Sequence, residues 1–135
     1  MEMKNKEILI NKDSLLMDIQ GAFSSRYPFL RIDFLQTDKN AKTLKSMKID
    51  PGTSVKKISK LDTVYKIDIN DRRTVSEISD EFENKLGVMV QVSRKSGKVW
   101  NVISITDGWT LESQNSAGEF ISSEMAMTAQ KKNIS

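Results

Sequence analysis

Lysine and arginine are the residue types in this sequence whose grouping could do chemistry. Seven lysines lie between Thr37 and Thr63, and three aspartates leave this segment a net charge of +4, while the whole 135-residue chain carries +3. The lysines are Lys39, Lys42, Lys45, Lys48, Lys56, Lys57 and Lys60. Grouped lysines can neutralise phosphates, which gives nucleic-acid binding that weakens steeply with salt. The segment has no aromatic residue to stack on bases, so a solvated loop is the simpler interpretation.

Two arginines form a second candidate site. Arg72 and Arg73 come directly before Thr74, where a helix is expected to begin, so their guanidinium groups could join free helical amides in binding an anion. The alternative is that both arginines point into water or pair with a nearby carboxylate, from Asp71, Glu77 or Asp80. A third candidate is Trp109, since an exposed tryptophan can anchor an interface. We expect Trp100 to be part of the core instead.

Several kinds of chemistry are excluded or unsupported. The chain has no cysteine and no histidine, which removes disulfides, thiol nucleophiles, the Ser-His-Asp triad and the usual zinc ligands. We expect the acids Asp80, Glu81 and Glu83 to lie on an exposed helical face, and Ser96-Gly97-Lys98 lacks the upstream glycine of a phosphate-binding loop. We expect no cofactor and no metal, and catalysis stays open with non-catalysis favoured. The polar N-terminus and the absence of long apolar runs predict a cytoplasmic protein without membrane association.

The elements that must position these residues begin with two strand-helix-strand units. The first has a strand at 8–10, a helical face of Leu16, Ile19 and Phe23, and an alternating strand at 30–34. The second has a strand at 65–69, a capping box from Thr74 to Glu77, a helix ended by Gly87, and a strand at 88–92. Matching apolar positions are 59 residues apart, from Ile8/Ile67 to Phe23/Phe82, with a slip of one residue in the closing strands. We interpret this as an architectural repeat.

The rest of the chain is less regular. A hairpin is expected around Ser96-Gly97, with a returning strand at 99–103. Residues 109–121 could form another hairpin or a short helix. The basic segment 37–63 is predicted to be an insertion or long loop, with short helices as an alternative. The domain is expected to span 1–122, followed by a flexible tail at 123–135.

This order predicts an α+β, two-layer sandwich with a ferredoxin-like β-α-β-β-α-β layout and an additional C-terminal hairpin. One face of its sheet should be wet, lined by Arg31, Asp33, Lys66, Asp68, Gln91 and Ser93, none of them aromatic as an RNA platform would require. The stretch Tyr27-Pro28-Phe29-Leu30 resembles segments of small bacterial proteins, and this resemblance implies no activity.

Three functions remain in competition. The favoured one is a small non-catalytic protein-interaction or regulatory module, acting through a sheet edge, the hairpin or the basic loop. The alternatives are nucleic-acid or anion binding through residues 39–60 with Arg72 and Arg73, and a small-ligand binder or enzyme whose pocket uses neither histidine nor cysteine. The oligomeric state is open.

Overall fold

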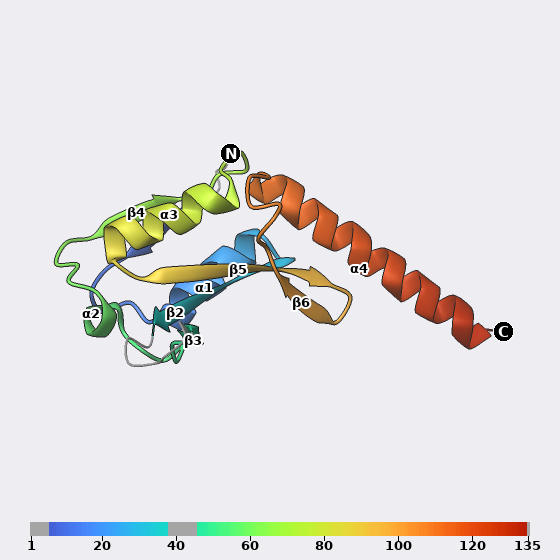
Figure 1. Ribbon diagram of the computed structural model, residues 1–135, viewed down its shortest axis with the longest axis horizontal. Helices are drawn as coiled ribbons and strands as arrows, with labels where there is room; N and C mark the ends of the chain where they lie inside the picture. The colour runs from blue at the N-terminus through green and yellow to red at the C-terminus, as the bar shows by residue number, and fades with distance from the viewer. Residues whose placement is uncertain (1–5, 38–45, 135) are drawn as a thin grey trace.

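The protein is an α+β fold with two antiparallel sheets and four helices, seen here in a computed structural model that describes residues 6–37 and 46–134 (Figure 1). The elements in chain order are β1 (Glu7–Ile10), α1 (Leu16–Arg26), β2 (Leu30–Thr37), β3 (Ser46–Lys48), α2 (Val55–Ile58), β4 (Tyr65–Asp68), α3 (Val75–Leu86), β5 (Met89–Ser96), β6 (Val99–Val102) and α4 (Leu111–Ile134).

The strands are divided between two sheets. One contains β1 and β4, and the other has the order β3-β2-β5-β6, with every neighbouring pair antiparallel. A ferredoxin-like layout would place the strands of both units in one sheet. That topology is therefore not confirmed, although the α+β class is. The sequence pattern could not distinguish the two arrangements, because alternation shows which face of a strand is buried and not which strand lies beside it.

The core is one cluster that draws on both sheets and on α1 and α3. The helical faces predicted from spacing are buried in it, including Ile19 and Phe23 of α1 and Ile78 and Phe82 of α3. The Phe82 ring meets the Phe34 ring of β2 edge-on, with centroids 5.6 Å apart. Burial of these faces supplies the main driving force for the fold.

The two halves of the chain are related by a pseudo-two-fold axis. In the small sheet Glu7 pairs with Asp68, and Leu9 pairs with Lys66. Lys66 and Asp68 lie 59 positions after Glu7 and Leu9, so exchanging the two strands gives the same pairing. In the large sheet β2 and β5 are central, and their pairing includes Ile32 opposite Val92, an offset of 60. The outer strands β3 and β6 then lie at the two edges. The repeat seen in the sequence is thus a symmetry of the pairing itself.

The symmetry extends to how the helices begin. The N–H of Leu16 donates to the Thr53 carbonyl at 2.9 Å, and the N–H of Val55 donates to the Ser14 carbonyl at 2.8 Å. In the second half Leu111 donates to Arg73 at 2.7 Å, and Val75 donates to Trp109 at 3.4 Å. The start of each helix is therefore capped by the loop before its partner helix, which satisfies amides that a helix start leaves free.

Each half is accordingly a β-α-β-β-α unit. The segment 37–63, expected to be an insertion or long loop, supplies β3 and α2 and completes the first unit. The hairpin is confirmed, but its two turn residues are Gly97 and Lys98, one position later than expected. Gly97 has φ = 67°, a left-handed conformation that glycine adopts at little cost.

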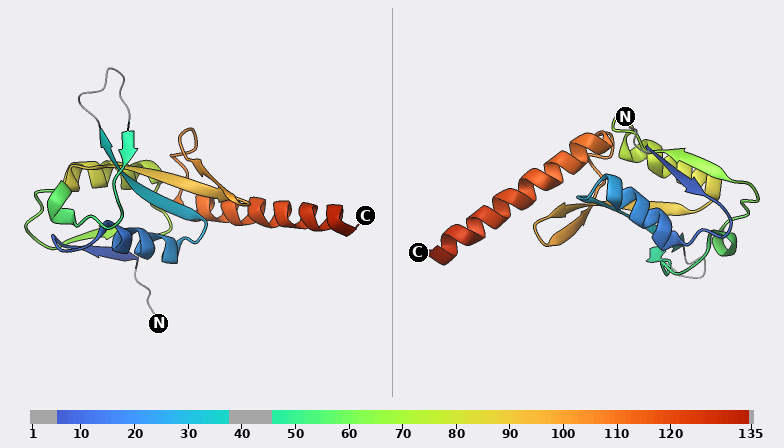
Figure 2. Two further views of the ribbon diagram at one scale, coloured as in Figure 1. Left: turned by 90° about the horizontal axis from the view of Figure 1, so that it is seen from below. Right: turned by 180° about the vertical axis from the view of Figure 1, so that it is seen from behind.

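The halves differ most at their last helices. α2 has four residues, whereas α4 has 24 and extends away from the body of the protein (Figures 1 and 2). Of the alternatives for 109–121, the helix is the one found. Residues 123–134, which we expected to form a loose tail, continue that helix. No helix in the described residues combines the length and apolar character that crossing a bilayer requires.

The sheet face that we expected to be exposed to solvent is only partly exposed. Lys66 and Asp68 are exposed, but Asp33 and Ser93 are buried. Asp33 lies within reach of the Arg31 guanidinium, at 3.3 Å, and of the Lys48 ammonium, at 3.5 Å. Trp100 is half-buried on this face under Arg31, 4.9 Å from the ring centre, so our prediction that it belongs to the core is wrong.

Candidate functional site

Two adjoining depressions lie beside α2 and share part of their lining. Their volumes are about 720 and 620 Å³, and both are lined by Lys57, Ile58 and Gly87. We call them together the α2 groove. It is lined by Leu35, Gln36, Ile49, Thr53 and residues 56–62 and 85–89.

The groove exists because α2 is short. The helix stops at Ser59, whose backbone is extended (φ −140°, ψ 152°) and whose N–H closes the single turn on the Val55 carbonyl. Residues 59–62, which follow the helix, line the groove, and Leu61 packs against the core. Gly87 ends α3 in a left-handed conformation (φ 70°) and turns the chain into β5. The groove lies between these two chain reversals.

The floor of the groove is apolar. Ile49, Ile58 and Leu61 are partly buried and pack against the core, and Leu86 and Val88 are buried. These side chains give a ligand in the groove apolar surface to pack against.

The rim of the groove is basic. Four lysines line it (Lys56, Lys57, Lys60 and Lys85) with Asp62 as the one acid, a net charge of +3. Lys56 lies 3.6 Å from Asp13, and the Lys85 ammonium lies 6.0 Å from the Tyr65 ring centre. Within the described residues, Lys57 and Lys60 have no ion pair. Their charges are available to a partner.

The structure therefore brings together three of the seven predicted lysines. Lys48 lies elsewhere, beside Asp33, and Lys39, Lys42 and Lys45 fall outside the described residues. Sequence reasoning missed Lys85. Its position in the last turn of α3, two residues before the glycine that ends the helix, was visible, but nothing in the sequence placed that end beside α2.

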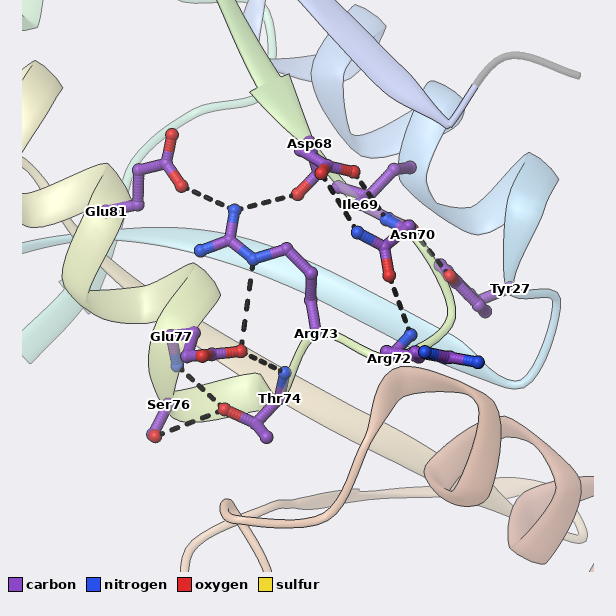
Figure 3. Close-up of polar contacts among 10 residues, drawn as sticks. All are labelled: Tyr27, Asp68, Ile69, Asn70, Arg72, Arg73, Thr74, Ser76, Glu77 and Glu81. Atoms are coloured by element: carbon purple, nitrogen blue, oxygen red, sulfur yellow. Dashed lines mark hydrogen bonds and ion pairs between the residues drawn. The ribbon is translucent and has the colours of Figure 1, made fainter.

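The two arginines of the second candidate site are used differently (Figure 3). Arg73 donates to the Glu81 carboxylate at 2.6 Å and to the Asp68 carbonyl at 3.0 Å, and its Nε lies 3.9 Å from Glu77. Arg72 is exposed, and its backbone N–H donates to the Asn70 side chain at 2.8 Å. Arg73 is partly buried and ion-paired, as the alternative interpretation expected, but its close partner is Glu81, which was not among the carboxylates named, and Glu77 lies farther away.

The amides at the start of α3 are also occupied. The predicted capping box is present: Thr74 and Glu77 each accept the other's backbone N–H, at 3.1 and 2.8 Å. The next two amides, of Val75 and Ser76, donate to the carbonyls of Trp109 and Asp107. The first four amides of this helix start are therefore not free to bind an anion. This geometry favours a structural role for Arg73 and its carboxylate partners.

Two tyrosines are the groups whose acidity the fold changes. Tyr65 donates a hydrogen bond to Glu81, and partial burial, followed by that bond and the negative charge, raises its pKa to about 12. Tyr27 is buried and bonds to the Ile69 carbonyl at 2.5 Å and to Asp71 at 3.0 Å, and burial is the main cause that raises its pKa. Both tyrosines hold their protons at neutral pH, so neither is suited to act as a base.

Trp109 lies at the start of α4. Its side chain is 47% exposed, and the guanidinium of Arg94 lies 5.9 Å from its ring centre. Arg94 also donates to the buried Gln114 at 2.9 Å. These contacts tie the ring to the body, while about half of it stays accessible.

Among the residues that the structure describes, no three carboxylates gather closely enough to hold a metal ion. Comparisons with protein-family models, curated proteins and solved structures find no match for this chain. What the domain does must therefore be argued from the groove.

Proposed function

We propose that this domain is a non-catalytic protein-interaction module whose α2 groove binds an acidic, amphipathic helix. The observation that carries the proposal is the combination of an apolar floor with four rim lysines, two of them without an ion pair in the described part of the chain. Helices that dock in grooves place apolar side chains on the floor at i, i+3/i+4 and i+7. Acidic side chains on the flanks of such a helix would then lie beside the rim lysines.

The pseudo-symmetry favours a helix over an extended segment. In the second half, α4 packs at Gly118 against Phe29 and Lys95. The equivalent positions in the first half, offset by 59 and 60 residues, are Val88 and Leu35, and both line the α2 groove. The groove therefore occupies the place that a helix fills in the other half and that the single turn of α2 leaves open.

The nucleic-acid alternative has the same lysines in its favour. The groove lining, however, contains no aromatic side chain for base stacking, and half of it is apolar. These features match a protein helix better than a phosphate backbone.

Selection from a display library of helical peptides would test the proposal. We expect the enriched peptides to combine acids with apolar residues at helical spacing, and K57E/K60E to weaken their binding by about tenfold or more, since rim charges are reversed. The matched control is K66E, an exposed lysine of β4 outside the groove. Enriched peptides without acids, or equal binding by K57E/K60E, would overturn the proposal. Binding of a single-stranded oligonucleotide instead, lost in the same variant, would replace it with the nucleic-acid alternative.

A further inference from the structure

One edge of the large sheet is open along β6. This strand is the last in the order β3-β2-β5-β6 and pairs with β5 alone. The Ile103 N–H, just beyond β6, donates to the Val92 carbonyl at 2.9 Å. Backbone groups of an antiparallel strand alternate in direction, so Asn101 also faces β5. Trp100 and Val102 therefore direct their N–H and C=O groups to the open edge, where the described residues offer them no partner.

The edge formed by β6 carries no charge. Natural sheets protect an edge from pairing with another chain by placing charged residues on it. The other three edge strands of the described residues each have at least one: Glu7 in β1, Lys48 in β3, and Lys66 and Asp68 in β4. β6 has none, and the uncharged run extends from 99 to 106. The edge of β6 is thus the one without this protection.

The same run exposes apolar side chains. Val99 and Val102 are 57% and 56% exposed, and Ile105 is 95% exposed. Helix α4 packs on the turn at Gly97 and leaves these side chains uncovered. Valine, isoleucine and tryptophan favour strands. An uncharged run of such residues on an open edge is suited to pair with one more strand.

The order of side chains along β6 favours a second copy as that strand. Antiparallel pairing about a two-fold axis at Asn101 places this residue opposite its own counterpart. It also places Trp100 opposite Val102 and Val99 opposite Ile103. The two asparagine amides can exchange hydrogen bonds, and the apolar side chains contact one another across the strands.

The neighbouring registers are less complementary. An axis at Trp100 would place Lys98 opposite Val102. An axis at Val102 would place Asn101 opposite Ile103. Each of these registers pairs a polar side chain with an apolar one, which the axis at Asn101 avoids. A self-complementary strand of this kind is what an isologous dimer requires.

We propose that two copies of this chain pair through β6, with the two-fold axis at Asn101. Their two four-stranded sheets then form one continuous sheet. The proposal does not depend on the function of the α2 groove. α2 lies at one end of the body and β6 toward the other (Figure 1), so both grooves stay open in the dimer.

Sedimentation velocity from about 1 µM to about 1 mM tests the proposal, because a contact of one strand pair is small and should be weak. We expect association that rises with concentration and ends at a dimer. N101K and N101E should each weaken it about fivefold or more, since like charges then lie directly opposite each other. The matched control is Leu9→Lys on β1, also 57% exposed, which should associate like the unchanged chain. A monomer over the whole range would overturn the proposal.

A mixture of the two charge variants makes the test specific. N101K and N101E together should associate more strongly than either variant alone, because opposite charges then meet at the axis. Only an axis at Asn101 brings position 101 of both copies together. A mixture that associates no better than its components would overturn the assigned contact.

A disulfide tests the same geometry. The chain has no cysteine, so a cross-link in Asn101→Cys must join position 101 of two copies. Facing residues that exchange no backbone bonds have Cα atoms about 4.5 Å apart, within the range of a disulfide. We expect Asn101→Cys to form a covalent dimer under mild oxidation. Val99→Cys is as exposed but lies opposite position 103, so it should cross-link far more slowly. Equal cross-linking of both variants would overturn the proposed pairing.

Discussion

A Cβ atom added to Gly118 would lie 2.8 Å from the Cβ of Phe29, a separation shorter than real side chains tolerate. Helix α4 thus approaches the loop after α1 as closely as a helix backbone can, and the absence of a side chain at this position allows it. The same position would also meet Arg94 and the Lys95 carbonyl, both at 3.1 Å.

Gly118→Ala should therefore lower the free energy of unfolding, by about 1–2 kcal/mol, because overpacking exceeds the helix-propensity gain. Gly21→Ala is the matched control. It is also a helical glycine, with nothing within 4 Å of the added Cβ, and should stabilise the protein by about 0.5–1 kcal/mol. Urea unfolding of both variants checks the pair. Equal effects of the two substitutions would contradict the close packing of α4.

The two tyrosines should lose their protons at a higher pH than a free tyrosine does. They are the only ones in the chain, and the pKa of each is raised, that of Tyr65 to about 12. In the folded protein tyrosinate absorbance should not appear near pH 10, whereas in urea it should appear there.

The corresponding stability change has a definite sign. A folded pKa above the unfolded one means that the unfolded state loses its proton first, so stability is intact below pH 10 and falls as the pH rises from there toward 12. Tyr65→Phe should make this fall shallower. Ordinary titration near pH 10 in the folded protein would show that the Tyr65–Glu81 contact does not form.

Gln114 ties the start of α4 to the turn before it. Its buried side chain donates to the Thr106 carbonyl at 2.6 Å and accepts from Arg94 at 2.9 Å. Gln114→Ala removes both bonds and should cost about 2–3 kcal/mol, since Arg94 and Thr106 lose their partner in a site closed to water. Hydrogen exchange should show faster exchange in the first turns of α4. Glu112→Ala, an exposed neighbour, should leave stability within about 0.5 kcal/mol.

Truncation after Ser122 tests what the distal half of α4 contributes to stability. Residues 123–130 are exposed and lie outside the core. Removing 123–135 should therefore change the free energy of unfolding by less than about 1 kcal/mol, as measured by urea unfolding. A large loss of stability would mean that the distal half of α4 serves the fold of its own copy.

Local patterns predicted most of the individual elements. The apolar faces of α1 and α3, the capping box at Thr74 and the glycine end of α3 at Gly87 all appear as expected, because each depends on residues within one or two turns. The pairing of β1 with β4 was not predictable in this way, since strand neighbours are chosen by contacts far apart in the sequence. For the same reason the caps of α1, which come from carbonyls near Pro51 and Thr53, leave no local pattern.

The candidate site was predicted only in part. Lys56, Lys57 and Lys60 were found by composition, but the groove they border depends on where α2 stops and on what α3 and β5 place beside it. Residues 123–134 contain few large apolar side chains, which made a tail the natural expectation. A helix can continue without core contacts when few of its residues disfavour the helical conformation. Residues 123–134 contain neither glycine nor proline.

The exchange of backbone hydrogen bonds between helix starts also shows how the two halves are related. Two β-α-β-β-α units pair β1 with β4 and β2 with β5 about one axis, and each pairing centres on equivalent residues, Ile8 with Ile67 and Ile32 with Val92. That is the geometry of an isologous homodimer, here with the two units joined into one polypeptide. The last helices depart from this symmetry: α4 packs against Phe29 and Lys95, whereas α2 ends after one turn and leaves the equivalent residues, Val88 and Leu35, lining the groove.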